Sequence, residues 1–196
     1  MSARPDTVMV FAAGLGTRMR PISETIPKPL VKVGGKALID HCLDLFADAG
    51  VRRAIVNVHY LPDQIEAHLA GRTAPEIVIS DERAQLLDQG GGIRKVLPLL
   101  QGKPFYLCNT DAFWIEGPHS NISALAEAWD PERMDALLAW RAGAATSEAP
   151  LAEKIVALPV KARVWRWAGW AAAALMMLGA VFFALGDSEL ESGHGG

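Results

Sequence analysis

The chain has 196 residues, of which 51% are hydrophobic, and a formal net charge of −3 at pH 7. This length is enough for one α/β domain of ordinary size with an appendage. Because no basic cluster is large enough to neutralise several phosphates, the composition excludes nucleic acid as an expected partner. The two cysteines, Cys42 and Cys108, lie among apolar residues without metal-ligand spacing, which predicts reduced, buried thiols in a cytosolic domain.

The first predicted element is a continuous apolar run, residues 8–13, which leads into Gly14 and Gly16. A run without polar alternation predicts a strand of a parallel sheet that is covered on both faces. The two glycines can adopt backbone angles that other residues avoid, so main-chain N–H groups can approach a bound anion. Arg18 and Arg20 add guanidinium groups, which match phosphate oxygens in a bidentate manner. The segment therefore predicts a phosphate-binding loop.

Two familiar glycine loops fit this segment poorly. The Walker A loop ends in Gly-Lys-Ser/Thr, whereas Gly16 is followed by Thr17 and Arg18. The dinucleotide-binding fingerprint needs a third glycine at the position that Met19 occupies. A nicotinamide-dependent oxidoreductase therefore remains an alternative that rests on the paired glycines alone.

Strands and helices are expected to alternate along the rest of the chain. Apolar residues at three-to-four-residue spacing predict a helix over residues 38–49, which Gly50 ends. Further strands are expected at residues 54–58, 76–80, 104–111 and 134–139, with helices opened by Pro62, by the glycines before Val96, and by Ser120 or Asn121. This order indicates right-handed β-α-β units and hence a Rossmann-like α/β fold: an open, mostly parallel sheet with helices on both faces.

A second glycine cluster, Gly90 to Gly92, stands at the start of the helix that runs through Val96 and Leu100. Three consecutive glycines at a helix start cost chain entropy unless a ligand approaches the backbone closely. The cluster is therefore a second candidate for nucleotide contact, and a flexible loop is the alternative interpretation.

Asp111 follows the last apolar strand of the predicted parallel sheet. In open α/β sheets, ligands collect outside the carboxyl ends of the strands, so Asp111 and the Gly14 loop are expected to meet there. Mg²⁺ prefers carboxylate oxygens and is often shared with substrate phosphates, which makes Asp111 a candidate metal ligand. The alternative is a helix cap or a turn. His59, which ends a strand, is expected to have a structural role.

The segments Gly14–Pro21 and Pro27–Pro29 resemble the sugar-1-phosphate nucleotidyltransferases, also called sugar-nucleotide pyrophosphorylases. The signature of that family is Gly-x-Gly-Thr-Arg-x-x-Pro, followed shortly by Pro-Lys-Pro. The Ala-Ala-Gly opening, the three glycines at 90–92 and the segment Asn109-Thr110-Asp111 are most similar to bacterial N-acetylmuramate-1-phosphate uridylyltransferases. Mannose-1-phosphate guanylyltransferases are similar as well and remain an alternative. Gln89 departs from the threonine that the family pattern has there.

The resemblance implies transfer of a nucleotidyl group from a nucleoside triphosphate, with UTP favoured, to a sugar-1-phosphate. The attacking oxygen is already anionic, so catalysis would depend on alignment and on neutralising crowded negative charge. Arg18 would stabilise the departing pyrophosphate, Lys28 would bridge the donor and acceptor phosphates, and Mg²⁺ on Asp111 would draw charge from the α-phosphate. The implied nucleotide-binding residues are Ala13, Gly14, Gly16, Thr17, Gly90, Gly91 and Asn109.

The resemblance covers residues 5–139 and ends at a segment of small residues. Family members continue with further strands, a sugar-binding region and a second aspartate for the metal, none of which is recognisable here. Residues 1–139 are therefore expected to form an incomplete nucleotidyltransferase domain, and residues 140–163 a linker. The strand that ends at Asp111 is expected at an exposed sheet edge unless residues 154–158 pair with it. A truncated or frame-altered product is one interpretation, and a catalytically impaired nucleotide-binding module tethered to a membrane is the functional alternative.

Residues 164–186 are the last predicted element. They contain an uncharged apolar run that Trp165, Trp167 and Trp170 precede, with basic residues before it and acidic residues after it. This pattern predicts a transmembrane helix whose N-terminal side is cytoplasmic, and a packed core helix is the alternative. Since the N-terminus has no apolar signal-type segment, the catalytic part is expected in the cytoplasm, anchored in the inner membrane, with residues 187–196 as a polar tail.

Overall fold

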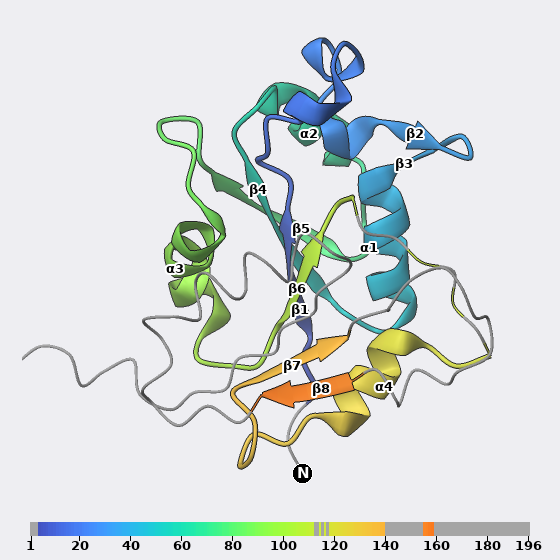
Figure 1. The fold of residues 1–196 in the computed structure, drawn as a ribbon, viewed down its shortest axis with the longest axis vertical. Helices are drawn as coiled ribbons and strands as arrows, with labels where there is room; N and C mark the ends of the chain where they lie inside the picture. Colours follow the sequence, from blue (N-terminus) through green and yellow to red (C-terminus); the bar gives the residue numbers. More distant parts are fainter. Residues whose placement is uncertain (1–3, 112–113, 115, 117, 140–154, 159–196) are drawn as a thin grey trace, which may run out of the picture.

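The centre of the fold is a parallel sheet of four strands. The computed structural model describes residues 4–111, 114, 116, 118–139 and 155–158. The strands are β1 (Thr7–Phe11), β4 (Arg53–Val58), β5 (Glu76–Asp81) and β6 (Tyr106–Asn109). Their order is β5-β4-β1-β6, and every pairing is parallel (Figure 1). The predicted α/β fold with a parallel sheet is therefore confirmed.

Helices cover both faces of this sheet, as the sequence predicted. They are α1 (Leu38–Asp48), α2 (Pro62–Leu69), α3 (Gln89–Leu100) and α4 (Asn121–Ala128). Figure 1 shows α3 on one side of the sheet and α1 on the other. Alternate residues of β1 enter separate cores: Val8 and Val10 pack in the core that includes α1, α2 and α4, whereas Met9 packs in the core of α3. This two-sided burial explains why β1 is apolar without alternation.

The helix ends follow the expected signals. Gly50 has φ +86° and follows α1, and Pro62 is the first residue of α2. Ser120 is the N-cap of α4, because its side chain accepts a hydrogen bond from Ser123 N. The three consecutive glycines form the first turn of α3, which begins at Gln89.

The connection from β1 to α1 is longer than a simple turn. It contains three short 3₁₀ turns, η1 (Thr17–Met19), η2 (Ile22–Glu24) and η3 (Lys28–Leu30), and an antiparallel hairpin of β2 (Lys32–Val33) and β3 (Lys36–Ala37). Figure 1 shows this connection beyond one end of the main sheet. The sequence analysis did not predict the hairpin.

The strand that ends at Asp111 was expected at a sheet edge unless residues 154–158 pair with it, and residues 155–158 do not pair with it. Strand β8 (Ile155–Leu158) pairs antiparallel with β7 (Ala136–Ala139), and these two strands form a separate sheet. Strand β7 thereby satisfies the backbone groups along one side of β8. Among the described strands only β1 pairs with β6, which leaves β6 at the edge of the main sheet. Strand β7 begins at Ala136 because a turn precedes it, in which Met134 N donates to Asp130 O.

Both predicted thiols are buried and free. Cys42 of α1 donates to Sγ of Cys108 in β6, at an Sγ–Sγ distance of 3.2 Å. The hydrogen bond with Cys42 and the burial of the site both raise the pKa of Cys108. A raised pKa keeps the thiol protonated and unreactive.

Several predictions from the sequence fall on residues outside the described ones. These are most of the linker 140–163, the predicted transmembrane helix 164–186 and the tail 187–196. Within the described part of the chain, no helix has the length and apolar character that crossing a membrane requires.

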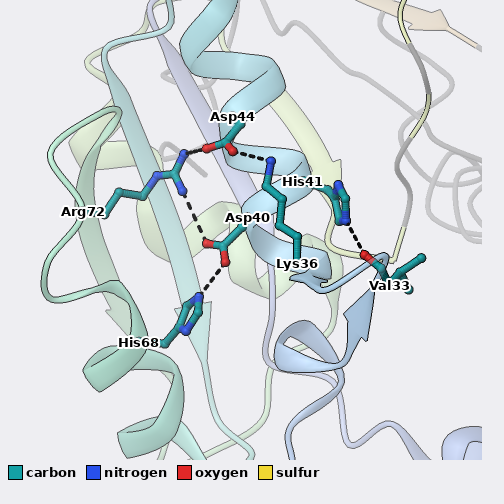
Figure 2. A network of polar contacts seen from close by, with 7 residues as sticks. All are labelled: Val33, Lys36, Asp40, His41, Asp44, His68 and Arg72. Atoms are coloured by element: carbon teal, nitrogen blue, oxygen red, sulfur yellow. Dashed lines mark hydrogen bonds and ion pairs between the residues drawn. The ribbon is translucent and has the colours of Figure 1, made fainter.

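An ionic network joins α1 to the hairpin and to the segment after α2 (Figure 2). Asp44 forms ion pairs with Lys36 and Arg72, and Arg72 also contacts Asp40 Oδ1 at 3.4 Å. His68 Nε2 lies 2.8 Å from Asp40 Oδ2. Burial raises the pKa of Asp44, but the hydrogen bonds from Lys36 and Arg72 outweigh burial and lower the pKa overall.

The lowered pKa of Asp44 predicts a pH-dependent contribution to stability. A carboxyl whose pKa is depressed on folding stabilises the protein above its unfolded pKa, about 3.9 for Asp, and loses that contribution as the pH falls. Asp44→Asn should therefore lower the free energy of unfolding at pH 7, and the difference from the wild type should shrink at pH 3. Urea unfolding at both pH values measures this difference. The control is Asp48→Asn, since Asp48 is exposed on the same helix without an ion pair among the described residues; an equal loss in both variants would contradict the prediction.

Candidate active site

The carboxyl ends of β1 and β6 lie side by side and place two predicted site segments together. Phe11 is paired with Asn109 in the sheet register. Just beyond it, Thr110 donates through Oγ1 to Phe11 O at 3.1 Å. The Gly14 loop and Asp111 therefore begin at the same edge of the sheet, as expected for open α/β folds.

The start of the loop is held by a side chain of the neighbouring strand. Oδ1 of Asn57 in β4 accepts hydrogen bonds from Ala12 N at 2.7 Å and from Ala13 N at 3.3 Å. Asn57 is only 3% exposed, so its side chain serves the backbone and not the solvent. Ala13, a predicted nucleotide-binding residue, thus has its amide already engaged by the protein.

Beyond Ala13 the loop is open. Gly14 is exposed, and a Cβ built on it would meet nothing within 4 Å. The hydrogen bonds among the described residues leave the amides of Gly14, Leu15 and Gly16 without a protein acceptor. Three successive free amides at a strand end form a concentration of positive partial charge that suits an anion. The remaining predicted loop residue, Thr17, is exposed at the start of η1.

Gly16 has a different reason to be glycine. Its φ is +62°, and a Cβ there would lie 3.1 Å from Ser23 Cβ and 3.3 Å from Lys28 Cβ. Ser23 Oγ also donates to Gly16 O at 2.7 Å. Gly16 therefore lets the loop pack tightly on the segment that carries Lys28, and this contact brings the lysine to the loop.

Lys28 forms an ion pair with Asp111, so the structure joins two of the three predicted catalytic residues. The side chains are 25% and 45% exposed, which leaves both accessible to a ligand. Only Oδ2 of Asp111 takes part in this contact. Pro27 and Pro29 flank the lysine, and Pro29 is buried, which fixes the backbone that carries it.

Arg18, the third predicted catalytic residue, is exposed in η1. Within the part of the chain that the structure describes, neither Arg18 nor Arg20 forms an ion pair. An unpaired guanidinium beside free backbone amides is available to bind phosphate oxygens.

The three glycines of the second cluster, Gly90 to Gly92, have three different roles. Gly90 is exposed, whereas Gly91 N donates to Oδ1 of Asp88, the N-cap of α3. Gly92 is buried, and a Cβ there would lie 3.2 Å from Glu82 Oε1 and 3.3 Å from Met9 Cε. Of the two predicted nucleotide contacts, Gly90 and Gly91, only Gly90 thus has an amide that no described residue accepts from. Gly92 is required for packing α3 against the sheet.

Two residues of this region were missed from the sequence: Asn57, described above, and Glu82. Asn57 Nδ2 donates to Glu82 Oε1 at 3.0 Å, and Leu87 N donates to Glu82 Oε2 at 3.3 Å. Asn57 stands inside an otherwise apolar strand, and that interruption was the signal that could have identified it. His59 contacts Glu82 O through Nδ1 at 2.7 Å, a contact within the protein.

The donor set at Asp111 fits Mg²⁺ as a single protein ligand. Mg²⁺ commonly binds through one or two carboxylates, with waters and substrate phosphates completing its shell. Asp111 offers an exposed carboxylate at the strand end, with Oδ1 not engaged by the described residues. The described residues contain no group of three or more His, Cys, Asp or Glu side chains that could hold a metal ion.

A parallel sheet covered on both faces, with an open glycine loop after its first strand, is typical of α/β nucleotide-binding domains. The family model described as "MobA-like NTP transferase domain" matches residues 8–181, and the chain belongs to this family. The family resemblance predicted from the glycine loop and the Pro-Lys-Pro segment is thus confirmed.

The similar proteins include two with the same name. The N-acetylmuramate alpha-1-phosphate uridylyltransferase of Caulobacter vibrioides is 55% identical over 142 residues, which cover 70% of this chain and 59% of that protein. The protein of that name in Neisseria meningitidis serogroup B is 44% identical over 105 residues, which cover 53% of this chain and 46% of that protein. The chain therefore spans less than two thirds of the length of these relatives.

A solved structure supports the fold. The inositol-1-phosphate CTP transferase from T. maritima matches with a TM-score of 0.57 at 20% identity, over 70% of this chain and 54% of that one. At this identity the likeness shows a shared fold. Membership of the NTP transferase family, and not this likeness, favours nucleotidyl transfer over the nicotinamide-dependent alternative, which rested on the paired glycines alone.

The contacts of Gly16 predict how alanine substitutions rank in stability. Gly16 and Gly34 both have positive φ, but a Cβ at Gly34 would meet nothing within 4 Å. Gly34→Ala should lower the free energy of unfolding by about 1–2 kcal/mol, because alanine is strained in a left-handed conformation. Gly16→Ala should lower it further, because Ser23 and Lys28 must also shift. Gly14→Ala, in open space, is the control with little loss. Urea unfolding provides the ranking, and equal losses at Gly16 and Gly34 would refute the contact argument.

Proposed function

We propose that the chain transfers a uridylyl group from UTP to a sugar-1-phosphate, with N-acetylmuramate 1-phosphate as the acceptor, and releases pyrophosphate. One observation carries the proposal: three free amides at Gly14 to Gly16 lie at the same sheet edge as the Lys28–Asp111 ion pair. The two relatives named as uridylyltransferases of N-acetylmuramate alpha-1-phosphate support the choice of base and sugar.

In this reaction an oxygen of the sugar-1-phosphate attacks the α-phosphorus of UTP. The bond between the α-phosphorus and the oxygen that bridges it to the β-phosphorus breaks, and pyrophosphate leaves. The acceptor oxygen is anionic, so no residue has to remove a proton from it. The protein must hold two polyanions in line and offset their repulsion. The amides of Gly14 to Gly16 would bind the triphosphate, and Arg18 would neutralise the departing pyrophosphate. Gly90 and Asn109 complete the proposed nucleotide contacts.

Lys28 and Asp111 have opposite tasks at the reacting phosphates. In the free protein each neutralises the other. When phosphates arrive, Lys28 would exchange its carboxylate partner for phosphate oxygens, and Asp111 would then be free to hold Mg²⁺. The metal supplies charge neutralisation at the phosphates when bound. The ion pair thus keeps the lysine in place before the substrate binds.

A nucleotide-binding protein without turnover is the second candidate. The observation that favours it is that no second metal-binding aspartate is recognisable among the residues of this sequence that follow Ala139. Calorimetric binding of UTP to the full chain, combined with an assay of pyrophosphate release, separates the two functions. GTP with mannose 1-phosphate is the second substrate pair to test.

Substitution of Arg18 and substitution of Lys28 are both expected to lower kcat. Each removes a charged contact to the transition state, so Arg18→Ala and Lys28→Ala should each lower kcat by about 10²–10³-fold. Arg18→Lys should recover only part of the loss, because an ammonium lacks the bidentate geometry. Pyrophosphate release measures the rates. Lys103→Ala is the control. Lys103 is exposed in the loop that precedes β6, at the amino end of that strand, whereas the site lies at the carboxyl end. A comparable loss in this variant would count against the assignment.

We also propose that residues 164–186 anchor a cytoplasmic catalytic part in the inner membrane, where an N-acetylmuramate nucleotide would serve cell-wall synthesis. The apolar run with its flanking tryptophans and basic residues supports this. The full chain should then resist carbonate extraction from membranes, whereas a variant ending at residue 163 should be extracted. Recovery of the full chain in the soluble fraction would favour a packed helix instead.

A further inference from the structure

A buried polar pair, Asn57 and Glu82, lies beneath the glycine loop, and no step of the proposed reaction uses it. Asn57 ends the apolar part of β4, and Glu82 directly follows β5. They are 3% and 1% exposed, so neither can reach a bound substrate. Placing a carboxylate out of water costs free energy unless hydrogen bonds compensate it. Such a group needs an explanation.

The hydrogen bonds of Glu82 fix the orientation of Asn57. An ionised carboxylate can only accept hydrogen bonds, so the NH₂ group of Asn57 must point toward Glu82 Oε1. The Asn57 oxygen then points the other way, toward Ala12 N and Ala13 N at the start of the glycine loop. A carboxylate two strands away from β1 thereby determines how the loop amides are held.

The other oxygen of Glu82 connects to the second glycine cluster. Glu82 Oε2 accepts from Leu87 N, one residue before Asp88, the N-cap of α3. Gly92 in the first turn of α3 packs against the pair, since a Cβ there would lie 3.2 Å from Glu82 Oε1 and 3.5 Å from Asn57 Nδ2. The pair therefore touches both glycine segments, although 45 residues separate Ala12 from Asn57.

We propose that Asn57 and Glu82 are positioning residues for the nucleotide: they set the spacing between the glycine loop, which is proposed to hold the triphosphate, and the α3 start, where Gly90 is proposed to contact the nucleoside part. This inference rests on the proposed function, because it needs a ligand that contacts both segments. A ligand consisting of phosphates alone would contact only the loop and would not depend on this spacing.

Single substitutions of nearly equal shape should break the pair. In Glu82→Gln only one side-chain oxygen remains, so it can accept from Asn57 Nδ2 or from Leu87 N but not from both. In Asn57→Asp a second carboxylate faces Glu82, and two acceptors meet without a proton. The double variant Asn57→Asp/Glu82→Gln restores every hydrogen bond: the aspartate accepts from the loop amides and from the glutamine NH₂, and the glutamine oxygen accepts from Leu87 N.

The test compares UTP with inorganic tripolyphosphate, both measured calorimetrically on the full chain. Glu82→Gln should weaken UTP binding about tenfold, which corresponds to about 1.4 kcal/mol, while tripolyphosphate binding changes less than twofold. The double variant should bind UTP within about threefold of the wild type, near 0.6 kcal/mol. Hydrogen exchange of the Leu87 amide should accelerate in Glu82→Gln and return to the wild-type rate in the double variant. Ser80→Ala is the control, since Ser80 is buried in β5 and its Oγ has no hydrogen-bond partner among the described residues.

The outcomes separate this inference from the proposed function. Equal UTP affinity in the wild type and Glu82→Gln overturns the positioning role and leaves the proposed function intact. Equal losses for UTP and tripolyphosphate, or a double variant as weak as the single ones, also overturn it, because a general loss of stability would explain them. Failure of the wild type to bind UTP overturns both proposals, whereas binding without turnover removes only the catalytic function.

Discussion

The structure around the site depends on where the backbone of β1 stops pairing with its neighbours. Main-chain amides that leave a sheet need other acceptors when they are buried. The first two such amides, at Ala12 and Ala13, donate to the side chain of Asn57, and the next three have no acceptor among the described residues. One asparagine therefore sets the boundary between the part of the chain that belongs to the fold and the part that can bind an anion.

Three segments distant in sequence reach this boundary through different contacts. The lysine segment arrives because Gly16 lacks a side chain and Ser23 bonds to its carbonyl. Asp111 arrives through parallel pairing of β6 with β1, and it then holds Lys28 by charge. The α3 start arrives because Gly92 allows close packing on Met9 and Glu82. Gly16 and Gly92 thus admit neighbouring segments, whereas a Cβ at Gly14 would meet nothing within 4 Å.

The sequence was sufficient for the parallel sheet and its helices, because consecutive apolar runs and helical periodicity record burial locally. It also placed Asp111 beside the glycine loop, since strand ends in a parallel sheet share an edge. It could not reveal the roles of Asn57 and Glu82, the β2–β3 hairpin or the β7–β8 pairing. The roles of Asn57 and Glu82 depend on partners 25 to 45 residues away. The β7–β8 pairing joins residues 16 to 22 positions apart, from Ala139 with Ile155 to Ala136 with Leu158. Strands β2 and β3 have only two residues each and are too short to show a period.

The charge near the glycine loop is positive, whereas the net charge of the chain is negative. The protein is acidic overall, with a net charge of −3, yet Arg18 and Arg20, which follow the open amides in the chain, form no ion pair with any described residue. The carboxylate of Asp111 is already neutralised by Lys28. A local positive field of this kind raises the concentration of anions at the sheet edge, while the acidic remainder discourages binding of nucleic acid elsewhere. The polyanion binding that the proposed function requires would thus depend on the positions of the cations and not on their number in the chain.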